Sequence, residues 1–74
     1  MYGIENDMLE TVKKFAEGQI AVHKMNVKIY LENPAGIGEH SDVTEAVIGE
    51  MKKIAEYDDV LEVVDKYFNS PLGG

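Results

Sequence analysis

The fold is decided by residues 8–31, which read MLETVKKFAEGQIAVHKMNVKIYL. Apolar side chains recur in this stretch every three or four residues, which is the spacing of one face of an α-helix. One row contains Met8, Val12, Phe15, Val22 and Ile29, with the polar Gln19 and Asn26 at the same phase. A second row beside it contains Leu9, Ala16, Ile20, Val27 and Tyr30. The pattern predicts one long helix over residues 5–32, which ends where Asn33 and Pro34 follow.

Residues 25–31 also fit a β-strand, because they alternate moderately in polarity and are rich in strand-forming side chains. No later segment with turn signals offers a partner strand, and a single strand is not stable. The helical phase continues unbroken through this segment, so helix is the favoured interpretation.

The rest of the chain predicts a loop, a second helix and a tail. Two glycines and a proline mark residues 33–41 as the loop. Either Ser41 or Asp42, with Glu45 three residues after Asp42, is expected to cap the next helix. That helix should cover residues 42–68 and be followed by a flexible tail over 69–74. Its apolar row contains Val43, Val47, Met51, Ile54, Tyr57, Leu61, Val64 and Phe68.

Two predicted helices joined by a short loop indicate an all-α fold, an antiparallel two-helix hairpin. Residues 1–74 are then a single helical-hairpin domain. A register with its turn at Gly38 places apolar residues opposite one another, in the pairs Met8–Phe68, Val12–Val64, Phe15–Leu61, Val22–Ile54 and Ile29–Val47. It also sets Gln19 against Tyr57 and Asn26 against Glu50. Polar layers of this kind usually fix the register of a helical seam at some cost in stability.

The predicted hairpin leaves several apolar residues without an obvious partner inside the chain. They are Ile20, Val27 and Tyr30 on the first helix, and Ile48, Ala55, Val60 and Val63 on the second. A chain of 74 residues without cysteine has no disulfide to stabilise it, and such small chains often complete their core by oligomerising. We therefore expect a homodimer that forms a four-helix bundle, with these residues as its interface.

The charge distribution indicates which classes of partner the protein can bind. Seven lysines, no arginine and fourteen acidic residues give a net charge of -7 and no basic stripe, which argues against nucleic-acid binding. Most of this charge lies in residues 33–74, and Glu56, Asp59 and Glu62 form an acidic face near the end of the second helix. A solvated surface is one interpretation of this face. The other is a docking surface for a basic protein partner.

No catalytic constellation is recognisable in the sequence. His23 is expected on the bundle side of the first helix, near Lys53, as a hydrogen-bonded histidine. His40 stands between acidic residues in the loop, where a metal site is the alternative to a solvated loop. No nucleophile accompanies either histidine. We expect a non-enzymatic protein without cofactor or metal; the alternative is a small metal-binding or catalytic bundle that uses His23, His40 and nearby acids.

The segment YLENPAGIGEHSD, residues 30–42, is followed by IAEYDD at residues 54–59. Through these segments the chain resembles small uncharacterised helical proteins of tailed marine bacteriophages, over residues 10–68. The resemblance implies a phage-encoded accessory or assembly protein in the cytoplasm of a bacterial host, and it assigns no functional residue. Independently, no apolar run is long enough for a transmembrane helix and the start lacks the basic residues of a signal peptide, so we expect a cytoplasmic protein without a membrane partner.

Overall fold

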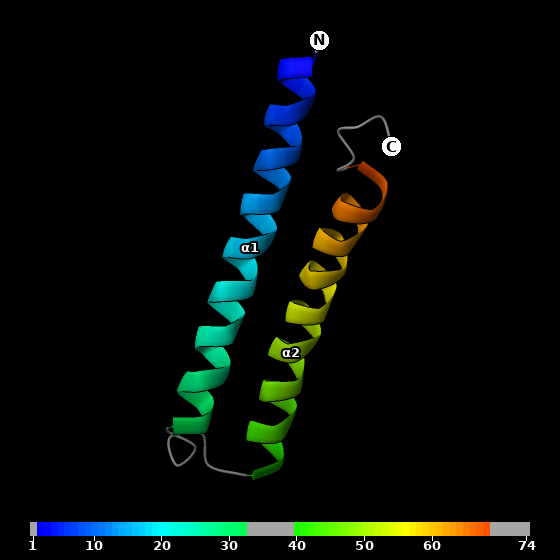
Figure 1. Cartoon of the computed structure of the whole chain (residues 1–74). Coiled ribbons are helices and arrows are strands. Elements are labelled where there is room, and N and C mark those ends of the chain that lie inside the picture. Colours follow the sequence, from blue (N-terminus) through cyan, green and yellow to red (C-terminus); the bar gives the residue numbers. More distant parts are fainter. Residues whose placement is uncertain (1, 33–39, 69–74) are drawn as a thin grey trace.

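The computed structural model describes the backbone of residues 2–32 and 40–68, and the side chains of residues 5–32 and 43–68. Helix α1 covers Tyr2–Glu32 and helix α2 covers His40–Val63, and a π-helical turn, η2, continues α2 over Val64–Phe68. Figure 1 shows α1 and α2 side by side and antiparallel. The described residues contain no strand, so the prediction of an all-α helical hairpin is confirmed.

The observed bounds agree with the predicted ones at the C-terminal ends and differ at the N-terminal ends. Both α1 and the second helical segment end where the sequence predicts, at Glu32 and Phe68, whereas α1 begins at Tyr2 and α2 at His40. The two helices begin three and two residues before their predicted starts, and assignments of helix ends commonly vary by one or two residues. The strand alternative for residues 25–31 is wrong, since α1 runs through them. The predicted turn at Gly38 and the tail 69–74 lie outside the described residues, as do the side chains of the expected capping residues.

The hairpin is a rod with little interior. Its radius of gyration is 16.7 Å and its extents are 54 × 17 × 12 Å, whereas a compact domain of this length has a radius of about 11 Å. Among the described side chains only Ala16, Val47 and Val64 are buried, and no polar one is. Two packed helices therefore leave most of their side chains open to another surface.

The predicted register is confirmed at one predicted pair, and the contacts of Tyr57 agree with it. The Asn26 side chain donates a hydrogen bond to Glu50, its predicted partner. The Tyr57 ring contacts both Phe15 and His23, which stand four residues before and after Gln19, the predicted partner of Tyr57. The alignment of the two helices along their length thus follows the pattern of the sequence.

The predicted rotation of α1 about its own axis is wrong. The second row of the sequence, with Ala16 at 1% exposure and Leu9, Ile20, Val27 and Tyr30 half-buried, faces the seam. The row expected there lies largely outside it, and consists of Met8, Val12, Phe15, Val22 and Ile29. The α1 members of the predicted apolar layers are therefore exposed. Ala16 explains the choice physically, because a methyl side chain lets the two helices approach closely at mid-seam.

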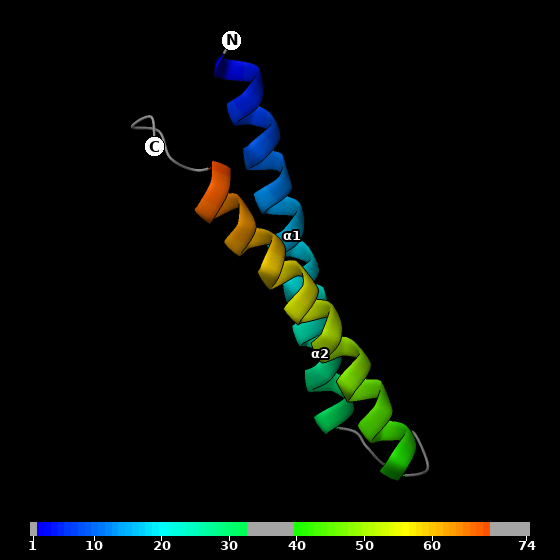
Figure 2. The same cartoon turned by 90° about the vertical axis from the view of Figure 1, so that its right-hand side faces the viewer.

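On α2 the predicted row faces α1 over most of its length, and only Met51 and Phe68 are exposed members of it. Figure 2 shows α2 passing across α1 at an angle. This crossing agrees with the exposure of Met8 and Phe68, which were predicted to pair at one end and are 65% and 60% exposed.

Candidate functional site

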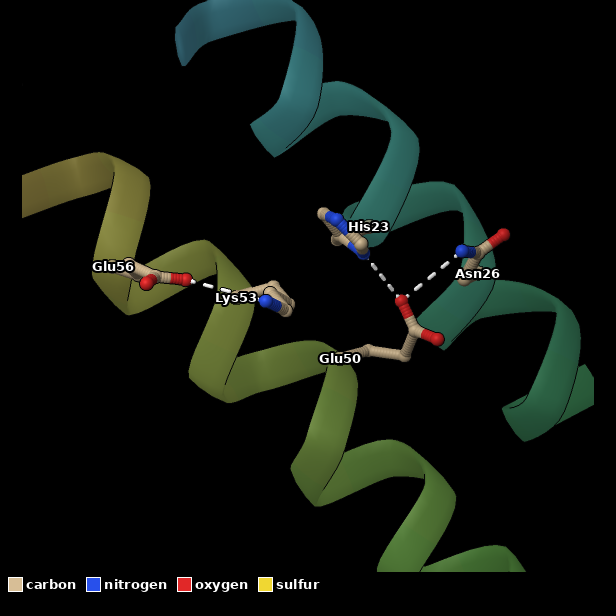
Figure 3. A network of polar contacts seen from close by, with 5 residues as sticks. All are labelled: His23, Asn26, Glu50, Lys53 and Glu56. Atoms are coloured by element: carbon tan, nitrogen blue, oxygen red, sulfur yellow. Dashed lines mark hydrogen bonds and ion pairs between the residues drawn. The ribbon is translucent and has the colours of Figure 1, made fainter.

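A polar cluster of His23, Asn26 and Glu50 lies in the seam between α1 and α2, and Figure 3 shows the first two side chains converging on the third. His23 and Asn26 are three residues apart on α1, so they occupy one face of the helix. Atom Oε1 of Glu50 lies 2.6 Å from Nδ1 of His23 and 3.0 Å from Nδ2 of Asn26. Two donors from one helix therefore meet one acceptor from the other.

The protonation of this cluster follows from its geometry. An ionised carboxylate only accepts hydrogen bonds, so Nδ1 of His23 carries the proton that it donates to Glu50. The hydrogen bond from His23, followed by that from Asn26, holds the pKa of Glu50 below its ordinary value, against a smaller opposite effect of desolvation. The side chains of His23 and Glu50 are 19% and 21% exposed, so water screens this pair only in part.

Aromatic contacts adjoin the polar cluster. The ring of Tyr57 stacks nearly parallel to the imidazole of His23, with 6.4 Å between centroids and 11° between planes. The ring of Phe15 meets Tyr57 edge-on at 5.9 Å and 69°, an arrangement that aromatic pairs favour. The middle of the seam is thus held by directional contacts rather than by a thick apolar core.

The predicted contact between His23 and Lys53 is not the one formed. His23 bonds to Glu50, and Lys53 lies 3.5 Å from Glu56 in an exposed ion pair on α2 (Figure 3). The contact of His23 with Glu50 was not predicted from the sequence, although the predicted pairing of Asn26 with Glu50 pointed to it. Because His23 lies one turn from Asn26, the carboxylate that serves one also reaches the other.

Potential metal ligands are few in this part of the molecule. The described residues contain no group of three or more His, Cys, Asp or Glu side chains arranged to hold an ion. His23 and Glu50 are adjacent, with each already hydrogen-bonded to the other. The side chain of His40, the other histidine of the predicted alternative, lies outside the described residues.

The predicted dimer-interface residues divide into two sets. Ile20, Val27 and Tyr30 share the face of Ala16 and His23 and are half-buried within the hairpin, so the premise that they lack a partner inside the chain is wrong. Val60 is also half-buried. The other predicted members, Ile48, Ala55 and Val63, are exposed on α2.

A long row of exposed apolar residues lies on α1 instead. We call it the α1 stripe, and its residues are Met8, Val12, Phe15, Val22, Met25 and Ile29. Their exposures range from 41% for Val12 to 65% for Met8. Single exposed apolar residues are ordinary in proteins, but a contiguous row of them marks an interaction surface.

A shorter apolar groove lies between the two helices near the C-terminal end of α1. Val27, Leu31, Met51 and Ile54 line it, with Lys24, Lys28 and Glu32 at its rim. Residues of both helices line this groove, whereas all residues of the α1 stripe lie on α1.

The predicted acidic docking face, Glu56, Asp59 and Glu62, is exposed on α2. It is not uniformly negative, since a shallow groove on this surface is lined by Lys52 and Lys53 as well as by Glu56 and Asp59. The Lys53–Glu56 pair partly neutralises the near end of the face. The face is therefore mixed in charge at its end near Lys53.

Comparisons with known proteins returned no match to a family model, to a curated protein or to a solved structure. Neither described helix combines the length and apolar character needed to cross a membrane.

Proposed function

We propose that this protein is a non-enzymatic, self-associating interaction or assembly module, in which two hairpins combine into a four-helix bundle. The observation that carries the proposal is a contrast: three residues are buried in the described chain, whereas a row of large apolar side chains on α1 is exposed. Burying such side chains is the main source of stability for folded proteins and complexes. A second hairpin supplies the surface that one hairpin lacks.

The exposed area agrees with this proposal. The chain exposes 5888 Å², and a compact monomer of its mass exposes about 4,500 Å². The difference is larger than the area of about 800 Å² that each partner contributes to a standard interface. A dimer of hairpins would bury part of this excess area.

Sedimentation velocity of the full chain over a hundredfold range of concentration tests the proposal. We expect a concentration-dependent species of twice the chain mass, with the helical circular dichroism of a folded protein. A folded species of single chain mass over the whole range would contradict self-association.

A basic protein is the second partner that we propose, docking on the acidic face formed by Glu56, Asp59 and Glu62. Opposite charge across an interface mainly raises the association rate and the selectivity. Capture from the native host, with the triple variant Glu56→Gln, Asp59→Asn, Glu62→Gln as the matched control, tests this part. We expect a basic protein that the wild type retains and the variant loses; equal retention by both would contradict a role for this face.

The resemblance to tailed marine bacteriophage proteins supports, as part of the same proposal, an accessory or assembly role in the cytoplasm of a bacterial host. The alternative function, a metal-binding or catalytic bundle around His23 and His40, makes a different prediction. Elemental analysis of the purified protein would then find a stoichiometric metal, and His23→Ala would remove it.

A further inference from the structure

We propose that the α1 stripe is the self-association surface, and that it pairs with the α1 stripe of a second copy in antiparallel orientation, about a two-fold axis next to Gly18. The inference rests on the proposed function and deepens it, because it names the surface and the geometry. It also replaces the interface predicted from sequence, whose α1 members lie inside the hairpin.

The stripe has the spacing of a helix-pairing surface. Met8, Phe15, Val22 and Ile29 recur every seven residues, and Val12 and Met25 flank them. A seven-residue apolar repeat keeps one face of a helix against a partner helix over several turns. The stripe extends over 21 residue steps, or about 30 Å of helix. In the hairpin this repeat lies beside the seam, since the neighbouring row with Ala16 packs on α2, and of its members Phe15 has a ring contact with α2, at Tyr57.

The stripe is complementary to itself when it is reversed. A two-fold axis between Gly18 and Gln19 brings Phe15 opposite Val22 of the second copy, Val12 opposite Met25, and Met8 opposite Ile29. Every apolar member of the stripe then meets another apolar member. A two-fold dimer uses one patch on both subunits, so a self-complementary patch is what such an interface requires. This property favours a second copy of the chain over an unrelated partner.

Gly18 lies at the centre of this arrangement. A glycine in the middle of a helix costs roughly 1 kcal/mol relative to alanine, and nothing inside the hairpin requires it, since a β-carbon placed there would meet no atom within 4 Å. At a two-fold axis the absent side chain lets two helix backbones approach closely.

The charges of α1 favour the antiparallel orientation. Residues 2–17 contain four acids and two lysines, and residues 18–32 contain one acid and two lysines. Their net charges are therefore -2 and +1. Antiparallel pairing sets each half against the half of opposite sign, whereas parallel pairing sets like charges together. The effect is small at physiological salt, because these charges are exposed.

Single cysteines test the geometry directly, because the protein contains none of its own. Under mild oxidation, Gly18→Cys should cross-link to itself. Met8→Cys alone and Ile29→Cys alone should not, because an antiparallel pair holds the two copies of each residue about 30 Å apart, far beyond the reach of a disulfide. An equimolar mixture of the Met8→Cys and Ile29→Cys proteins should cross-link. Efficient self-cross-linking of Met8→Cys would overturn the antiparallel arrangement.

Two matched charge variants test the surface. Val22 in the stripe and Met51 in the apolar groove are 51% and 50% exposed, so a glutamate at either position is tolerated by the folded hairpin. We expect Val22→Glu to raise the dissociation constant of the dimer at least tenfold, and Met51→Glu to change it less than threefold, both with wild-type helical circular dichroism.

The outcomes separate the two proposals. A wild-type dimer that survives Val22→Glu and is dissociated by Met51→Glu would overturn the stripe as the interface and leave self-association intact. A wild-type chain that is monomeric at all concentrations would overturn the proposed function itself. Loss of helical signal in Val22→Glu would move the test to the cysteine variants, whose side chains are smaller and uncharged.

Discussion

His23 of α1 and Glu50 of α2 are joined by a hydrogen bond of 2.6 Å across the seam, and the same carboxylate oxygen accepts a second bond from Asn26. This relationship fixes the hairpin at one point along its length, because a shift of either helix by one turn would separate both donors from the acceptor. The predictions below concern this seam, and each compares variants at one protein concentration, since self-association adds to apparent stability.

The first prediction concerns pH. The pKa of Glu50 is lowered in the folded protein, first by the bond from His23 and then by that from Asn26. The folded chain therefore binds this proton less readily than the unfolded one, and the resulting stability is fully present above the ordinary pKa of glutamate. It is lost as pH falls through the lower pKa of the folded state. Glu50→Gln should be less stable than wild type at pH 6, and the difference should vanish at strongly acidic pH.

Urea unfolding of the two proteins between pH 6 and pH 2.5 measures this difference. Glu45→Gln is the control, because it removes an exposed carboxylate from the same helix. A difference that grows as the pH falls would contradict the assignment of the lowered pKa to the bonded carboxylate of Glu50.

The second prediction separates the two polar residues of α1 at the seam. Gln19 is half-buried and forms no hydrogen bond to another described residue, whereas Asn26 donates to Glu50. Gln19→Leu should stabilise the protein by about 1 kcal/mol through added apolar burial. Asn26→Leu should give no such gain, because Glu50 loses one of its donors. Chemical denaturation measures both, and equal stabilisation by both variants would show that the bond from Asn26 contributes nothing.

The third prediction concerns Ala16, which is 1% exposed. Ala16→Leu should destabilise the protein by about 1–3 kcal/mol, because the larger side chain forces the helices apart. Ala21→Leu is the matched control, since it makes the same change at an exposed position of the same helix. Thermal unfolding distinguishes them, and a tolerated Ala16→Leu would mean that α1 is free to rotate toward its other apolar row.

The fourth prediction concerns the aromatic contacts of Tyr57. Tyr57→Leu should cost about 1 kcal/mol beyond the change in apolar area, because it removes the ring that meets both Phe15 and His23. Tyr57→Phe keeps the ring and should be close to neutral, since the hydroxyl has no hydrogen bond to another described residue. The two variants are compared by urea unfolding; equal losses would indicate that the hydroxyl, and not the ring, is what matters.

Residues 8–31 show which structural features could be predicted from the sequence and which could not. Their three-and-four spacing predicted a long helix, and the pairing of Asn26 with Glu50 was predicted because opposing positions of an antiparallel hairpin follow from one choice of turn. The spacing did not show which of two neighbouring apolar rows faces α2. The pairing register placed the row with Met8, Phe15 and Val22 in the seam, and so it assigned Ile20, Val27 and Tyr30 to an outer interface.

The sequence by itself determined the two helices, their antiparallel order and their register, because helical periodicity and a single loop constrain all three. Only the tertiary structure decided the rotation of α1. Two apolar rows one position apart are nearly equivalent along an isolated helix. Which row faces the seam therefore depends on contacts with α2. These contacts are the packing of the buried Ala16, the ring of Tyr57, and the bonds that His23 and Asn26 donate to Glu50. That rotation leaves the α1 stripe exposed, where a second copy of the chain is the partner we propose.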